Sequence, residues 1–393
     1  MNILYITDSD PRETGYGAAQ RTYWLWLALK RIGTVYTVSN VGHEIALSKD
    51  EKERIASWRL ASSFRPFRTA QAFFANVASP MVWPFKFSRS IYAKLPWRDV
   101  KFDAVVVRYL HWAETSRAWQ FGQLYVDIDD LPTEAYEKIF RKNHHGFTGW
   151  LWGKFVPLWQ ARLLRKCHGA WVSNPMQVEC VQKFTSCLSL PNLPMPPKAG
   201  YVMNGRQKRQ LMTVGLMGYQ PNYEGVDWFV DNVWPEVRRR YPDLTYAVVG
   251  GGVPKQLAKK WKTIAGVEVR GFVEDLDALY EQSLAVVAPI FLGAGTCIKV
   301  AEAVIRGRKL FATKVALRGY EASWILDSKI SEFKDADDFV RELTAFIALK
   351  DDERDALQMQ ILEVSQNGFA FDSFANQVQK LIATSDLAVK EER

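Results

Sequence analysis

The N-terminal half of the chain alternates short apolar runs with segments that have the period of an amphipathic helix. An apolar run over 2–7 precedes a loop with Gly15 and Gly17, and residues 18–32 then have a helical period. Further apolar runs typical of buried parallel strands cover 35–38, 103–107 and 123–128. A strand, a helix and a second strand in this order make a β–α–β unit, which predicts a parallel sheet.

A proline-rich segment separates this half from a second half with the same alternation. Residues 191–197 hold four prolines and a polar, basic stretch runs on to 209, so we place an interdomain linker at 191–209. Apolar runs in the second half cover 211–214, 244–249, 267–270, 285–288 and 310–313. The pattern predicts an α/β protein with two Rossmann-like parallel-sheet domains, 1–190 and 210–368. A C-terminal helix and tail, 369–393, can cross back to the N-terminal domain.

Polar residues at the expected helix starts predict how those helices are capped. Their side-chain oxygens can accept hydrogen bonds from unpaired amides of the first turn. Asn222 precedes a helix whose apolar face comprises Val226, Phe229, Val230, Val233 and Val237. Asp130 or Thr133 would cap a helix over 134–140, and Asp372 or Ser373 would cap the C-terminal helix.

The composition excludes several classes of protein. With 48% hydrophobic and 24% charged residues the chain is globular, and no apolar run is long enough for a membrane-spanning helix. The N-terminus lacks a basic region followed by an apolar one, and the four cysteines form no CxxC pair, so we expect a cytoplasmic protein with reduced thiols. The net charge of +8 and the 15 tryptophans indicate an anionic partner, for which nucleic acid, a membrane surface and a phosphorylated substrate remain open.

The segment 289–307, PIFLGAGTCIKVAEAVIRG, has the clearest chemical signal in the chain. A strand is expected to end at its first residue, a loop with Gly293 and Gly295 follows, and a helix is expected to start near Thr296. Backbone amides at such a helix start attract a phosphate group, and glycine lets that group approach closely. The segment therefore predicts a phosphate-binding loop.

Three charged residues follow this loop at helical spacing. Lys299, Glu302 and Arg306 share one stripe of the expected helix, opposite the apolar residues. The lysine can meet a diphosphate as a point charge, and the carboxylate can accept two ribose hydroxyls. The alternative interpretation is a solvent-exposed face on an ordinary helix.

The C-terminal half resembles glycosyltransferase family 4, of the GT-B fold, in the branch found in bacterial polysaccharide loci. The resemblance is carried by residues 215–222 (GLMGYQPN), 250–251, 271–275 (GFVED) and 293–307. It extends more weakly to the N-terminal half through 15–17 and 127–130. It implies a nucleoside-diphosphate sugar donor bound in the cleft between the two domains, retention of anomeric configuration, and no essential metal or other cofactor.

The resemblance also implies roles for individual residues. Glu302 matches the glutamate that holds the donor ribose, and Ala294 occupies the position of the family's other glutamate, eight residues earlier. Lys299 would meet the diphosphate. The other expected donor-binding residues are Gly15, Gly17, Gly215, Gly271, Phe272, Val273, Gly293, Gly295 and Thr296, of which 271–273 form the loop that receives the base.

Three carboxylates follow an apolar run in the N-terminal half. Asp127, Asp129 and Asp130 come at the carboxyl end of the expected strand, where open α/β sheets place ligands. We predict these three, with Lys299, as catalytic residues. An Asp-x-Asp pair is also the metal motif of the GT-A fold, but that single-domain fold does not explain the second half. We therefore expect no metal site.

Other polar residues of this half are less specific. Arg108 and His111 end the preceding strand and are predicted to bind the acceptor, although a lone histidine is more often a structural hydrogen-bonding group. Arg21, inside the first helix, can face the cleft or solvent. The turn with Gly15 and Gly17 can approach a phosphate or be a plain tight turn.

Two segments combine basic and aromatic residues without any acidic residue. The first, 54–98, holds Arg54, Arg59, Arg65, Arg68, Lys86, Arg89, Lys94 and Arg98. The second, 138–166, holds six further basic residues besides Lys138, together with Trp150, Trp152, Phe155 and Trp159. Cations with interfacial aromatic residues are typical of a surface that binds an anionic membrane. The two segments would also suit single-stranded nucleic acid, but no nucleic-acid motif accompanies them. The alternative interpretation is that they form packed helices with a basic outer face.

These observations predict a glycosyltransferase that moves a sugar from a nucleoside-diphosphate sugar to a glycan acceptor in bacterial surface polysaccharide synthesis. The expected acceptor is linked to a polyprenyl diphosphate, and the expected location is the inner face of the plasma membrane. A nucleotide-sugar 2-epimerase of the same fold and a catalytically silent scaffold of polysaccharide assembly are the alternatives.

Overall fold

The computed structural model describes residues 1–39, 54–57, 97, 99–140, 146–201 and 208–391 of the chain. Two compact units make up the chain. The first comprises Met1–Pro191 together with Phe371–Arg393, and the second comprises Asn192–Ala370.

The first unit is built on a seven-stranded sheet whose paired strands are all parallel. In spatial order the strands are β3 (Ile55–Ser57), β2 (Thr34–Ser39), β1 (Asn2–Thr7), β4 (Ala104–Arg108), β5 (Gln123–Ile128), β6 (Gly169–Val172) and β7 (Ser186–Ser189). The chain adds strands on one side of β1 and then returns to add β4 on the other side. The carboxyl ends of β1 and β4 therefore mark the topological switch point of this sheet.

The second unit has a six-stranded sheet, again with parallel pairing throughout. Its order is β10 (Val267–Gly271), β9 (Thr245–Val249), β8 (Lys208–Val214), β11 (Ser283–Ala288), β12 (Leu310–Ala312) and β13 (Ser331–Glu332). The switch point here lies between β8 and β11. These two sheets confirm the prediction of two Rossmann-like parallel-sheet domains.

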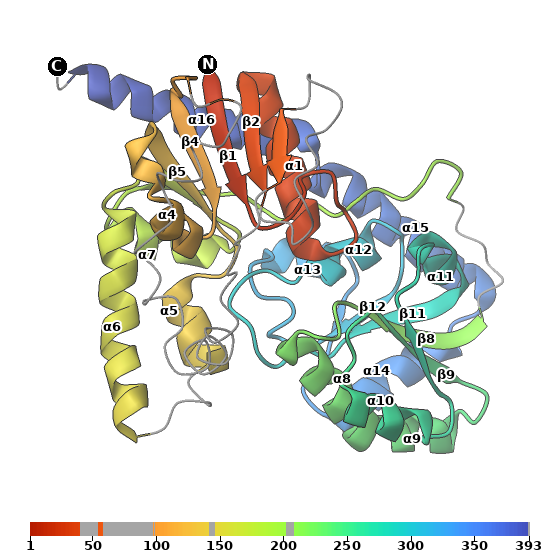
Figure 1. Ribbon diagram of the computed structural model, residues 1–393. Coiled ribbons are helices and arrows are strands. Elements are labelled where there is room, and N and C mark those ends of the chain that lie inside the picture. The colour runs from red at the N-terminus through yellow and green to blue at the C-terminus, as the bar shows by residue number, and fades with distance from the viewer. Residues whose placement is uncertain (40–53, 58–96, 98, 141–145, 202–207, 392–393) are drawn as a thin grey trace. The chain divides into compact units, whose positions relative to one another are not determined.

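Helices flank both sheets (Figure 1). In the first unit they are α1 (Gly17–Ile32), α4 (Leu110–Ser116), η1 (Ala118–Gln120), α5 (Pro132–Ala135), η2 (Tyr136–Phe140), α6 (Gly146–Leu164), η4 (Pro175–Gln177), α7 (Val178–Gln182) and α16 (Phe371–Glu391). In the second unit they are α8 (Gln220–Asn232), α9 (Trp234–Arg240), α10 (Lys255–Lys262), α11 (Leu276–Gln282), α12 (Ile298–Val304), α13 (Ala322–Asp327), α14 (Ala336–Ala348) and α15 (Asp351–Gly368). Strands β4 and β11 are buried along their whole length, because helices cover both faces of each sheet. This is why they are apolar apart from Arg108 at the end of β4 and Ser283 at the start of β11.

The C-terminal helix α16 packs on the first unit, beside α1 and the strands β6 and β7 (Figure 1). The Trp24 and Phe371 rings lie 5.3 Å apart between their centroids. Arg31 of α1 pairs with Asp372 at 2.6 Å. The C-terminal helix is therefore part of the first unit.

The predicted helix caps are wrong. Helix α8 begins at Gln220, so Asn222 lies inside its first turn, and Tyr219 is the capping residue. Helix α5 begins at Pro132, whose fixed φ suits a first helical position, and neither Asp130 nor Thr133 caps it. Helix α16 begins at Phe371, so Asp372 lies within its first turn.

Candidate active site

The carboxyl ends of β8 and β11 bring two glycine loops together in the second unit. Gly215 directly follows β8, and the loop after β11 contains Gly293. Helix α8 crosses the end of β11 closely, because a Cβ at Gly225 would lie only 1.7 Å from the carbonyl oxygen of Pro289. This close approach places the first turn of α8 beside the loop. Open parallel sheets bind their ligands at such a switch point.

Lys299, in the first turn of α12, points to this junction. Its Nζ donates a hydrogen bond to Oδ1 of Asn222 at 2.6 Å. Asn222 is itself oriented, since its Nδ2 donates to the carbonyl oxygen of Leu216 at 2.8 Å. A Cβ at Gly215 would lie 3.0 Å from the Asn222 amide and 3.1 Å from Lys299 Nζ, so a side chain there would crowd both groups. Burial lowers the pKa of Lys299.

The charged stripe of α12 is buried, so its interpretation as a solvent-exposed face is wrong. Lys299, Glu302 and Arg306 are each less than a tenth exposed. Arg306 lies just beyond the end of the helix, where its Nε donates to Asp277 at 2.7 Å and its guanidinium stacks over the ring of Tyr280. A buried charge is costly without partners, and these contacts supply them for Arg306. We therefore assign Arg306 a structural role, in which it fixes the end of α12.

The loop between β11 and α12 is held by hydrogen bonds from other parts of the unit. Gly293 has a φ of 147°, which strongly favours glycine. Asn192 donates from Nδ2 to Oγ1 of Thr296 at 2.9 Å. Arg318, after β12, donates from Nη2 to the carbonyl oxygen of Gly295 at 2.9 Å. The helix itself starts at Ile298 rather than near Thr296.

Arg318 is a candidate functional residue that the sequence analysis missed. Its buried Nε has no hydrogen-bond partner. The guanidinium lies beside the loop, since a Cβ at Gly293 would be 3.6 Å from Nη2. Its position after β12, at the same carboxyl edge as Gly215 and Gly293, is the signal that could have found it.

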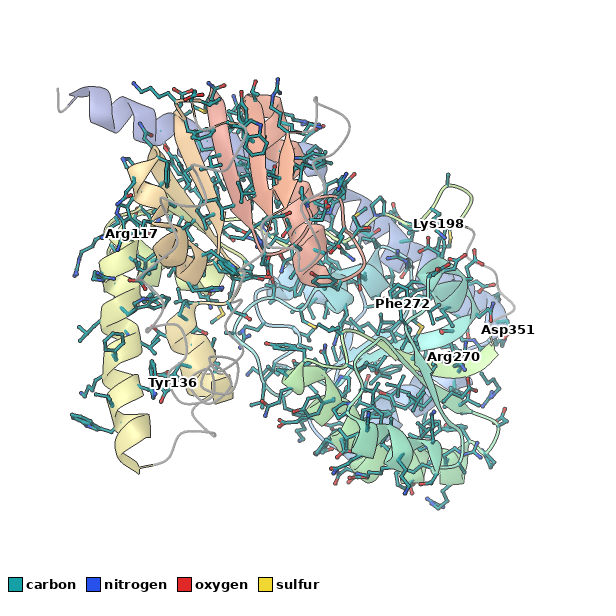
Figure 2. The ribbon with its side chains drawn as sticks, in the orientation of Figure 1. Arg117, Tyr136, Lys198, Arg270, Phe272 and Asp351 are labelled. Carbon is teal, nitrogen blue, oxygen red and sulfur yellow. The ribbon has the colours of Figure 1, made fainter. Side chains whose placement is uncertain are left out.

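The segment expected to receive the base follows β10. Gly271 has a φ of 69°, and its carbonyl oxygen accepts a 2.7 Å hydrogen bond from the amide of Gly250. Phe272, labelled in Figure 2, is 68% exposed, whereas Val273 packs against the core. An exposed aromatic ring of this kind can stack on a flat ring.

The three aspartates of the first unit have different environments. Asp127 is fully buried: Arg21 donates to it from Nε at 2.9 Å and from Nη2 at 2.6 Å, and Arg108 also donates to it. Burial raises the pKa of Asp127, but the charges of Arg21 and Arg108 outweigh this effect and hold it below its usual value. Arg108 also lies 3.7 Å from the partly exposed Asp129, and Asp130 is half-buried. Both arginines are therefore internal, and Arg21 does not face solvent.

The remaining predicted residues of this unit lie near the switch point of its sheet. His111 is half-buried in α4, stacks on Tyr109, and burial lowers its pKa to about 4, so it is neutral at pH 7. Gly17 begins α1, and the loop before it contains Gly15, where a Cβ would meet no atom within 4 Å. Sterics thus do not require glycine at position 15 in this structure.

Neither a metal cluster nor a membrane span occurs in the described part of the chain. No group of three or more His, Cys, Asp or Glu side chains there could hold a metal ion. Among those same residues no helix is both long and apolar enough to cross a bilayer. The basic segment 54–98 lies almost wholly outside the described residues, so its predicted role is not tested.

Comparison with known proteins gives a family match for the second unit and a known fold for the chain. Residues 208–348 match the family model of glycosyl transferases group 1. No curated protein sequence is similar to the chain. Similar solved structures include sucrose-phosphate synthase from Thermosynechococcus elongatus, at 15% identity and a TM-score of 0.68 over 98% of this chain and 99% of that one.

Two further solved structures are similar to this chain over nearly their whole length. WaaG, described as a glycosyltransferase involved in lipopolysaccharide biosynthesis, is 13% identical, with a TM-score of 0.62 over 96% of this chain and 99% of that one. HepE from Anabaena, solved in complex with UDP, is 10% identical, with a TM-score of 0.61 over 98% and 100%. Residues 208–348 thus match the family model of glycosyl transferases group 1, and the two parallel-sheet units of the chain have the GT-B fold of these structures.

Proposed function

We propose that the protein transfers a sugar from a nucleoside-diphosphate sugar to a hydroxyl group of a glycan acceptor, with retention of anomeric configuration. The observation that carries the proposal is the buried Lys299 at the switch point of the second sheet. It lies against Gly215, which has no side chain to block access, and one helical turn before the buried Glu302. A lysine beside a glycine loop suits a diphosphate. A carboxylate one helical turn further along suits the ribose next to that diphosphate.

In this mechanism the protein stabilises charge that builds on the departing diphosphate. Lys299 supplies one positive charge, and Arg318 supplies a second beside the carbonyl of Gly295. Prearranged charges act more strongly when they are shielded from water, as the buried Lys299 is. Glu302 orients the nucleoside through the ribose hydroxyls, and the exposed Phe272 stacks on the base. The donor needs no metal and no further cofactor.

The acceptor is proposed to be a glycan linked to a polyprenyl diphosphate, in bacterial surface polysaccharide synthesis at the inner face of the plasma membrane. WaaG acts in lipopolysaccharide biosynthesis, which supports such a role. Residues after β4 and β5 of the first unit, including the partly exposed Asp129, are proposed to contact the acceptor or the reacting centre. His111 is neutral at pH 7 and can accept or donate a single hydrogen bond there.

One observation favours a catalytically silent scaffold as the second candidate. Ala294, which stands where the family has a glutamate, is fully buried, so a carboxylate there would carry a large desolvation cost. A scaffold would bind the donor without turnover for every acceptor tried. A 2-epimerase would instead consume the donor with no acceptor present.

Glu302→Gln is expected to weaken donor binding by about 1–3 kcal/mol, the range for losing a charged hydrogen-bond partner. The substitution keeps the shape of a buried side chain, so the fold should survive. Isothermal calorimetry with nucleoside diphosphates and their sugars measures the effect. Glu268→Gln, in the same unit but on β10 with Arg270 as its partner, is the matched control. Unchanged affinity in folded Glu302→Gln would remove Glu302 from the donor site.

Sugar transfer is expected to persist in excess chelator. The charge on the leaving diphosphate is assigned to Lys299 and Arg318 rather than to a divalent cation. Turnover measured with and without chelator should agree within a factor of about two. Complete loss of activity, restored by manganese, would instead make Asp127, Asp129 and Asp130 candidates for metal ligands and contradict the roles assigned above.

A further inference from the structure

The helix α6 of the first unit exposes large apolar side chains together with cations. Trp150 is 58% exposed, Leu151 47% and Leu158 70%, and Lys154 is also exposed; Arg165, in the turn directly after the helix, is exposed too. At 100° per residue, the four positions within α6 fall within an arc of about 100° on one side of the helix. They extend over about 12 Å along it, and Arg165 follows at its C-terminal end. We call these five residues the outer face of α6.

The opposite side of α6 is fixed to its own unit. Trp152 is buried in a small cluster with Tyr136, and Trp159 is buried further along. Trp159 donates from Nε1 to Glu114 of α4, and Arg162 pairs with the same carboxylate. Anchors near both ends of the helix prevent it from turning its outer face inward. Trp152 and Trp159 are thus core residues, whereas Trp150 is exposed.

The segment 138–166 contains no acidic residue, so no charge within it offsets Lys154 and Arg165. Glu114, the carboxylate that contacts α6 in the part of the chain described, is buried and already taken by Arg162 and Trp159. The exposed face is therefore both apolar and cationic.

We propose that the outer face of α6 binds the anionic surface of a phospholipid membrane. Leucine side chains gain free energy by entering the boundary of the acyl chains, and a tryptophan ring is stable at the level of the headgroups. The two cations then meet lipid phosphates. Binding is reversible, because the helix lies on the bilayer and does not cross it. The proposal rests on the proposed function in one respect: a polyprenyl-linked acceptor would be presented to the enzyme at such a surface.

Co-sedimentation with vesicles tests the proposal in the full chain. We expect binding to vesicles of phosphatidylcholine with phosphatidylglycerol, less binding to phosphatidylcholine alone, and weaker binding as salt rises. Two double variants, Trp150→Ser with Leu158→Ser and Lys154→Glu with Arg165→Glu, should each lower the partition coefficient about tenfold or more. All four positions are exposed, so both variants should fold.

Matched controls lie in the second unit. Leu326 and Met359 are 72% and 57% exposed, close to Leu158 and Trp150. Their change to serine should leave vesicle binding unaltered. Lys255→Glu with Lys259→Glu controls for the charge reversal, because both lysines are exposed on α10. Equal binding of wild type to both kinds of vesicle, or to neither, would overturn the proposal. So would outer-face variants that bind as well as the wild type.

A second measurement separates this proposal from the proposed function. The thermal shift produced by UDP reports the donor site of the second unit. Outer-face variants should keep the wild-type shift. If no nucleoside diphosphate shifts the wild type while anionic vesicles still bind it, the donor-site assignment fails and the membrane surface stands. A normal shift without any vesicle binding gives the reverse conclusion.

Discussion

Lys299→Ala should lower sugar transfer by about 100-fold or more while leaving the fold intact. Removing one prearranged charge or donor from a developing anion costs about 2.7–4 kcal/mol in comparable sites. The hydrogen-bond partner of Lys299 is the uncharged amide of Asn222, so the substitution breaks a hydrogen bond to an amide and not one to a carboxylate. The turnover number, measured with saturating donor, should fall more than donor affinity does, because the charge on the diphosphate is largest in the transition state.

Asn222→Ala is the informative companion variant. It keeps the lysine but removes the group that holds Nζ, so turnover should fall by a smaller factor, about tenfold. Lys255→Ala, an exposed lysine on α10, should have no effect. Wild-type turnover in Lys299→Ala would show that the diphosphate is held elsewhere, and Arg318 would then be the first residue to test.

The fold could be predicted because its strands are buried on both faces. Apolar runs such as residues 104–107 of β4 are a direct consequence of helices on each side of a parallel sheet. The helix caps could not be predicted, because proline at the first or second helical position fixes the starts of α5 and α8 without a capping side chain. A side-chain cap is one way in which a helix starts, whereas these two helices have a proline in their first turn.

The candidate site was predicted only where its residues are close in sequence. Lys299 and Glu302 could be placed one turn apart from their spacing alone. The contact between Lys299 and Asn222 joins positions 77 residues apart, and it exists because α8 packs tightly on the end of β11. Arg318 depends in the same way on the order of β8, β11 and β12 in the sheet. Such contacts depend on the order of the strands in the sheet, and the pattern of residues along the chain does not specify that order.

Asp127→Asn is expected to destabilise the protein by about 3–5 kcal/mol, because it leaves two fully buried arginines without their shared carboxylate. Arg21 and Arg108 both donate to Asp127, and Arg21 also donates to the carbonyl oxygen of Leu190 at 2.8 Å. The free energy of unfolding in urea measures the loss. Asp129→Asn is the matched control: its carboxylate is partly exposed and 3.7 Å from Arg108, so the cost should stay below about 1 kcal/mol.

Acid should reduce the difference in stability between wild type and Asp127→Asn. The two arginines hold the pKa of Asp127 in the folded protein below the ordinary 3.8. A carboxyl whose folded pKa is lowered stabilises the fold fully above its unfolded pKa, and this contribution is lost as pH falls through the folded pKa. The difference should therefore be constant at neutral pH and shrink below about pH 4. A variant that unfolds like wild type but has lost sugar transfer would show that Asp127 acts in catalysis and not in holding Arg21 and Arg108.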